Sequence, residues 1–184
     1  MVVIKKDDIP YRNFIDTRKK FKFKPLNKKK INSFPKIVAF GKWYAIKHYW
    51  MGFFNNNKYD EINEQNEYKL NKKYNLYELK FKQKSLTNLK NVDFDKILVL
   101  KTKKDMIAFS KKYRDTNIDL ESYGNMVNIN WNKVVKNFGG IEVTVYPVSN
   151  YIRRHPDTSW YSMWDVPSGC IWNNKIIKEV NKIV

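Results

Sequence analysis

Alternation of apolar and polar residues marks the clearest strands that this sequence predicts. From Tyr77 onward every second residue of 76–82 is apolar, so this segment should form a strand with one buried face. Residues 141–146 alternate in the same way, and the pattern places Glu142 on the face opposite the apolar residues. Continuous apolar runs at 37–40 and 96–100 predict buried strands. Shorter apolar runs predict further strands at 2–4, 43–46, 160–164 and 169–172.

Helix signals are few, and the helices that they predict are short. Thr102 followed by Asp105 resembles a capping box and predicts a helix that ends near Tyr113. A second helix is expected over 131–137, between an N-capping asparagine and two glycines at 139–140 that close it. Weaker patterns favour a short helix or loop at 48–54 and an amphipathic turn or two at 176–184.

This mixture of elements determines the expected fold class. Short strands with few helices are typical of an α+β domain with a mixed or mainly antiparallel sheet. Helices and strands do not alternate regularly, which argues against a doubly wound parallel sheet. The 184 residues suit one domain. We therefore expect a single globular domain over 35–184, preceded by a basic N-terminal arm or edge segment over 1–34.

Basic residues are concentrated in the first part of the chain. The net charge is +18, and the stretch 17–36 contains no acidic residue. Lysines that neutralise phosphates release condensed counterions, so such a stretch is typical of a contact with a polyanion. Phe21 and Phe23 lie between the lysines and could stack on unpaired bases. The expected nucleic-acid contacts are Arg18, Lys19, Lys20, Lys22, Lys24, Lys28, Lys29 and Lys30, with Arg153 and Arg154 from a later loop.

Composition offers a second explanation for the charge. The chain has 31 lysines against 5 arginines and is rich in asparagine, isoleucine, tyrosine and phenylalanine. AT-rich genomes over-use these residue types, so codon usage alone could raise the lysine content. In either case lysine is a point charge without the guanidinium fork that reads guanine, so we do not expect sequence-specific recognition.

Few residues can carry metal or acid–base chemistry. One cysteine and two histidines exclude a disulfide framework and a cysteine-rich zinc site. Cys170 lies in an apolar run and should be a buried, inert thiol, and His48 lies in an aromatic run and should be packed. Asp93 and Asp95 form a D-x-D pair that could hold a cation, but no third carboxylate accompanies them, so no metal site is predicted.

Aromatic residues gather in one unusual segment near the C-terminus. Residues 160–172 contain three tryptophans and a tyrosine together with an acid, two serines and a glycine. The segment reads either as an aromatic pair of core strands with a tight turn, or as the wall of a small-molecule cleft. Residues 41–45 have the same character.

Together these two segments resemble the ADP-ribosyltransferases. Gly41, Trp43, Tyr44 and Ala45 match the G-x-[YW]-[FY]-[AS] strand that helps to form the nicotinamide pocket in that family. Residues 165–172 have the place and look of the late strand that carries the family's catalytic glutamate. The resemblance implies that the cofactor is NAD and that Trp43 or Tyr44 stacks on its nicotinamide.

The resemblance also implies roles for polar residues. The late segment contains no glutamate, so Asp165 and Ser168 are its catalytic candidates. Arg12 and Arg18 are the candidates for the arginine that the family carries on its first strand. The W-D-x-x-S-G-C-I-W pattern of 164–172 further resembles uncharacterised proteins of large DNA viruses and phages.

Three functions therefore stay open at this point. The first is sequence-nonspecific binding of nucleic acid or another polyanion through residues 17–36, the basic segment. The second is an ADP-ribosyltransferase-like protein that binds NAD, with or without activity. The third is a structural or virion component whose partner is an acidic protein. Since no apolar run approaches the 18 residues of a membrane span, we expect no membrane contact and a cytoplasmic, intracellular or virion location.

Overall fold

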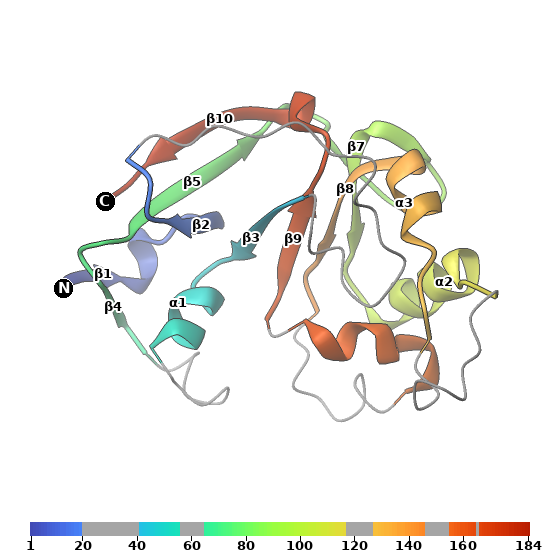
Figure 1. Cartoon of the computed structure of the whole chain (residues 1–184), viewed down its shortest axis with the longest axis horizontal. Helices are drawn as coiled ribbons and strands as arrows, with labels where there is room; N and C mark the ends of the chain where they lie inside the picture. Colours follow the sequence, from blue (N-terminus) through green and yellow to red (C-terminus); the bar gives the residue numbers. More distant parts are fainter. Residues whose placement is uncertain (20–40, 56–64, 117–126, 146–154, 165) are drawn as a thin grey trace.

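One large sheet dominates the computed structural model, which describes residues 1–19, 41–55, 65–116, 127–145, 155–164 and 166–184. Within these residues, eight strands form a mixed sheet that curls strongly (Figure 1). The α+β class that the sequence predicts is confirmed. The strands follow one another across the sheet in the order β10 (Ile177–Lys182), β5 (Asn75–Phe81), β2 (Arg12–Asp16), β3 (Lys42–Ile46), β9 (Ser168–Ile171), β8 (Phe138–Val143), β7 (Asp93–Leu100) and β6 (Leu86–Thr87).

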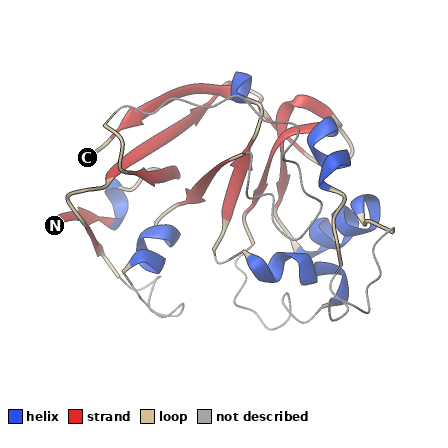
Figure 2. Ribbon diagram, viewed as in Figure 1, coloured by secondary structure: helices blue, strands red, loops and turns tan. Residues whose placement is uncertain are grey.

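Strand direction changes along the sheet. The pairs from β10 to β8 are antiparallel, whereas β8, β7 and β6 run parallel to one another. The connection from β7 to its parallel neighbour β8 passes through α2 (Lys103–Tyr113) and α3 (Trp131–Asn137). Both helices and the 3-10 helix Pro156–Met163 lie on the same side of this half of the sheet (Figure 2).

These helices cover the largest core cluster of the molecule. Met106 and Phe109 of α2 and Trp131 of α3 pack there with Ile141 and Cys170 of the sheet. The helices begin where the sequence predicts. Thr102 and Asp105 form a complete capping box, and the Asn130 side chain accepts a hydrogen bond from the Lys133 N–H.

The opposite face of the sheet is buried as well, because the sheet curls onto itself. Phe14, Tyr44 and Leu79 from β2, β3 and β5 belong to the same buried cluster as Ile97 of β7 and Ile171 of β9. Phe14 and Tyr77 stack with their ring centroids 5.1 Å apart. Both faces of the central strands therefore point into apolar cores, and an alternating pattern there does not separate buried from exposed residues.

A small second sheet covers the other side of β5. It pairs β1 (Val2–Lys5) with β4 (Glu67–Leu70) and packs with α1 (Tyr49–Phe54) around Met51, Tyr68 and Leu76. The strand predicted at 2–4 is thus confirmed. Two short 3-10 helices, Lys6–Asp8 and Asn174–Ile176, complete the elements of the described residues.

The first residues of the chain belong to the fold, which differs from the expected boundary between an arm over 1–34 and a domain over 35–184. β1 lies in the small sheet, and β2 lies inside the large sheet between β5 and β3. The basic segment is therefore the connection between two neighbouring antiparallel strands, β2 and β3. Residues 20–40 of that connection, including the strand predicted at 37–40, lie outside the described residues.

Several local expectations are corrected by tertiary contacts. Residues 160–164 lie at the end of a 3-10 helix that starts with Pro156, and not in a strand. The glycines at 139–140 lie in β8, and the helix before them ends with Phe138 as its C-cap. Most of 176–184 forms the edge strand β10, because β5 offers it backbone hydrogen-bonding groups and Lys80 pairs with Glu179 across the two strands.

Candidate functional site

The residues expected around a nicotinamide lie on two different faces of the sheet. Neighbouring side chains on a strand alternate, so Trp43 and Tyr44 point in opposite directions from β3. Trp43 contacts Trp164 edge to face, with 4.8 Å between the ring centroids. Ser168 pairs with Ala45 and shares the Trp43 face, where its buried hydroxyl donates to the Val166 carbonyl. Asp165 lies outside the described residues.

Tyr44 lies inside the curl of the sheet and is fully buried. Its ring covers Gly169 on the neighbouring strand β9, and a β-carbon at that glycine would overlap the ring. The position therefore requires glycine for close packing. The Tyr44 hydroxyl reaches over Gly169 to the next strand, β8, and donates to Glu142 Oε2 at 2.8 Å.

Glu142 forms a second, charged contact with Arg12 from β2. The Arg12 guanidinium donates from Nε to Oε2 at 2.6 Å and from Nη2 to Oε1 at 3.0 Å, which is the bidentate geometry of a strong ion pair. Glu142 is only 1% exposed and Arg12 is 20% exposed. The guanidinium also lies over the rings of Tyr11 and Phe81, at 4.9 and 4.8 Å from their centroids.

In this triad of Arg12, Tyr44 and Glu142, burial and the charge of Glu142 set the protonation of the other two members. Burial raises the pKa of Tyr44 well above its ordinary value, and the Glu142 charge raises it further, so the phenol stays a neutral donor. Burial alone would lower the pKa of Arg12, but the hydrogen bond and charge of Glu142 outweigh it and the net pKa is raised. A carboxylate buried in the sheet is thus fixed by one cation and one hydroxyl.

The sequence pattern does not single out Glu142 as a candidate. Its strand alternates, and such a pattern predicts an apolar face and an opposite polar face. The structure buries all six residues of β8, so the polar face is an interior face. One signal was available: Gly139 and Gly140 precede this glutamate, and glycines within a strand indicate close approach of other chain segments.

Another carboxylate, Asp16 at the end of β2, is contacted from both ends of the connection between β2 and β3. Arg18 donates to Asp16 from Nε at 2.8 Å and from Nη2 at 2.6 Å, and Lys42 Nζ lies 3.5 Å from Oδ2. The hydrogen bond from Arg18 is the largest cause that holds the pKa of Asp16 well below its ordinary value. Lys42 additionally lies 4.0 Å from the centroid of the Phe14 ring.

The expected nucleic-acid contacts divide into two groups. Arg18 and Lys19 are described and exposed, and Arg18 is engaged by Asp16. The others, Lys20, Lys22, Lys24, Lys28, Lys29, Lys30, Arg153 and Arg154, lie outside the described residues. Further exposed lysines cover the outer surface of the described part, among them Lys104, Lys111 and Lys112 on α2, Lys133 and Lys136 on α3, and Lys178 and Lys182 on β10.

The remaining candidate residues, Cys170 and His48, are packed inside the protein. Cys170 is buried, and burial strongly raises the pKa of its thiol, as expected for an inert cysteine. His48 is buried and stacks on Tyr68 with 5.7 Å between the ring centroids, so the expected packing is confirmed. Within the described residues, no three His, Cys, Asp or Glu side chains are grouped to hold a metal ion. No helix in the described part of the chain is long and apolar enough to cross a membrane.

Comparison of the chain with family models, with curated proteins and with solved structures found no match.

Proposed function

We propose that this protein binds nucleic acids through their phosphates, without preference for sequence. One observation carries the proposal: the chain cannot neutralise its own charge. Even if each of the 18 acidic residues paired with one base, 18 of the 36 basic residues would have no acidic partner in the chain. A phosphate backbone supplies that missing negative charge in a regular array.

The placement of the charges supports the same function. The acidic residue nearest to the basic segment, Asp16, is already shared by Arg18 and Lys42. The stretch 17–36 itself contains no Asp or Glu. Lysine also outnumbers arginine among the bases, which favours contact with phosphates over readout of base edges.

Salt dependence tests the proposal. Fluorescence anisotropy would measure the affinity for a labelled 20-mer of mixed sequence at several NaCl concentrations. If about 6–10 phosphates are contacted, the affinity should fall by roughly 10³–10⁵ between 50 and 200 mM salt. Oligonucleotides of unrelated sequence should bind equally. An affinity that does not change with the salt concentration, or no binding at low salt, would contradict the proposal.

A matched pair of variants tests the basic segment. The first variant changes Lys20, Lys22, Lys24, Lys28, Lys29 and Lys30 to glutamine. The control changes six lysines elsewhere, Lys69, Lys72, Lys73, Lys101, Lys104 and Lys111, and so has the same net charge. The first variant should lose most of the salt slope and the control little. Equal losses would show that the charge acts as a whole and not through this segment.

A second candidate function, an ADP-ribosyltransferase-like protein that binds NAD, is favoured by the triad. The resemblance calls for an arginine on an early strand, an aromatic residue on the G-x-[YW]-[FY]-[AS] strand, and a glutamate on a late strand, which the sequence pattern matches to 165–172 and not to the strand of Glu142. Arg12, Tyr44 and Glu142 are residues of these types, and they contact one another. In this arrangement Glu142 is enclosed, so Arg12, the most exposed of the three, would have to move away before a substrate could reach the carboxylate.

Ligand-observed NMR with millimolar NAD tests this second candidate. Saturation transfer to the nicotinamide protons should be seen with the unmodified protein. It should weaken in Glu142→Gln, because the Glu142 carboxylate is the group that the substrate would reach, and persist in Trp43→Ala, because Trp43 lies on the other face. Absence of transfer would contradict NAD binding, and loss in the Trp43 variant alone would place the site on the wrong face for the triad.

A further inference from the structure

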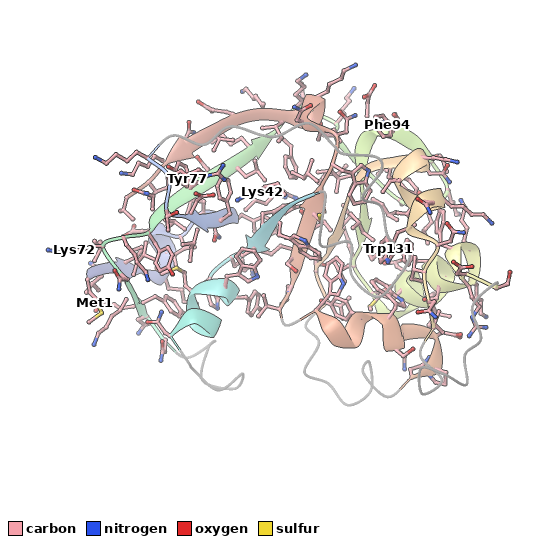
Figure 3. The ribbon with its side chains drawn as sticks, viewed as in Figure 1. Met1, Lys42, Lys72, Tyr77, Phe94 and Trp131 are labelled. Carbon is pink, nitrogen blue, oxygen red and sulfur yellow. The ribbon has the colours of Figure 1, made fainter. Side chains whose placement is uncertain are left out.

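An exposed aromatic residue, Phe94, is presented by a break in the regular pairing of β7 with β8. Asp93 pairs with Phe138 and Ile97 pairs with Gly140, so three residues of β7 lie opposite a single residue of β8. Such a bulge bends the strand and redirects its side chains. Phe94 lies inside the bulge and is 42% exposed (Figure 3).

The bulge is fixed by several specific contacts. The Asn173 side-chain amide donates to the Phe94 carbonyl at 3.0 Å and to Asp95 Oδ1 at 2.9 Å. The Asp95 N–H donates to Asp93 Oδ1 at 2.9 Å. Gly139 allows the Phe94 carbonyl to approach, because a β-carbon at that position would overlap it. The outward position of Phe94 therefore belongs to the fixed part of the fold.

The surroundings of Phe94 combine apolar surface with positive charge. Val92 is 48% exposed and Leu86, on the neighbouring strand β6, is 44% exposed. Exposed lysines come from segments that contact β7 or lead into it: Lys84 and Lys90 from the connections around β6, Lys136 from the end of α3, and Lys175 next to Asn173.

The acidic residues of this surface have partners within it. Asp93 forms an ion pair with Lys96 at 3.2 Å, and its hydrogen bond from the Asp95 N–H is the largest cause that lowers its pKa. Asp95 accepts from Asn173. The D-x-D pair that the sequence offers as a cation ligand thus serves to shape the bulge, and the charge of Asp93 is paired with Lys96.

We propose that Phe94 is a stacking platform for a base of single-stranded nucleic acid, with the surrounding lysines on the flanking phosphates. This inference rests on the proposed function and names its substrate class. An exposed aromatic ring combined with nearby positively charged segments is the arrangement by which proteins hold single strands without sequence preference. In a duplex both faces of each base are covered by its neighbours, so a single strand fits this site better.

Two oligonucleotides that differ only in their bases test the inference. Anisotropy would compare a labelled single-stranded DNA 15-mer with an abasic strand of the same length, which has the phosphates but no bases. Alanine at Phe94 should weaken binding of the normal strand by roughly 5- to 150-fold, the usual effect of losing one stacked base. It should leave the abasic strand unaffected, and Phe94→Tyr should restore binding.

Val3→Ala is the control, since Val3 is an exposed apolar residue, at 56%, on β1 of the small second sheet. It should bind both strands as the unmodified protein does. If the unmodified protein binds both strands with a steep salt dependence and Phe94→Ala changes neither, the stacking inference is overturned and the proposed function stands. If the unmodified protein binds a duplex but neither single strand, the inference is overturned and the proposed function stands; if it binds none of the three, both fail.

Discussion

Glu142 accepts two hydrogen bonds from the guanidinium of Arg12, although 130 positions separate these residues in the chain. The ion pair joins β2 to β8 across two intervening strands, and the Tyr44 hydroxyl joins β3 to the same carboxylate. Because both faces of the sheet are covered here, these polar groups have few alternative partners, and the fold depends on their meeting.

The first prediction concerns the free energy of unfolding of variants in this ion pair. Glu142→Gln should destabilise the protein by about 3 kcal/mol, since it leaves the charge of Arg12 largely buried without its partner. Tyr44→Phe removes a single hydrogen bond to the carboxylate and should cost about 1.5 kcal/mol. Urea denaturation followed by tryptophan fluorescence would measure both.

A double variant separates charge pairing from packing. Arg12→Met combined with Glu142→Met should be less destabilising than the sum of the two single changes, because it removes both charges together. If the double change instead costs as much stability as the sum of the two single changes, the two side chains do not stabilise one another.

The second prediction concerns pH and Asp16. Its pKa in the folded protein lies below the ordinary value of 3.8, first because of the hydrogen bond from Arg18. The stabilisation from this carboxylate is therefore complete above the unfolded pKa and is lost as the pH falls toward the folded pKa. The unmodified protein should be more stable than Asp16→Asn at pH 7, and the difference should shrink as the pH is lowered below about 4. A difference that grows toward acid would have the wrong sign.

The third prediction concerns Gly169. Its replacement by alanine should destabilise the protein by about 2–3 kcal/mol, because the new methyl group meets the ring of Tyr44. Thermal unfolding would show a lowered Tm. In a Tyr44→Leu background the same glycine change should cost clearly less, since the ring that it meets is absent. An equal loss in both backgrounds would place the clash elsewhere.

The fourth prediction concerns Asn173, which holds the bulge at Phe94. Asn173→Ala should loosen the bulge and weaken binding of a normal single strand more than binding of an abasic strand. Hydrogen exchange should quicken at residues 94–96 while the amides in the middle of β8 stay protected. Faster exchange throughout the sheet would instead show global destabilisation.

Local chemistry predicts some elements of this fold well. The capping box at Thr102 and Asp105, the N-cap at Asn130 and the alternating strand near Tyr77 all follow from short-range signals, and the structure contains them. Short-range signals do not predict β2 and β10, because each is defined by its pairing with the distant strand β5. The residues of a short segment do not determine which distant strand will pair with it.

The candidate site shows the same limit more sharply. Trp43 and Tyr44 are adjacent in the pattern that resembles the nicotinamide pocket, yet adjacency in a strand places them on opposite faces. The pattern does not reveal Glu142, because a polar residue in an alternating strand is expected to face solvent. The face that carries Glu142 is buried only because the sheet curls, and the curl depends on the whole chain.

The shared carboxylate of Asp16 has a consequence for how this protein can change over time. Because Arg18 and Lys42 meet there, the connection between β2 and β3 leaves and rejoins the sheet at one point. Each doubling of the length of a connection costs only about 0.6 kcal/mol in closure entropy. Residues inserted between Arg18 and Lys42 should therefore be tolerated while β2 and β3 keep their register, which makes this connection a suitable graft site for engineering.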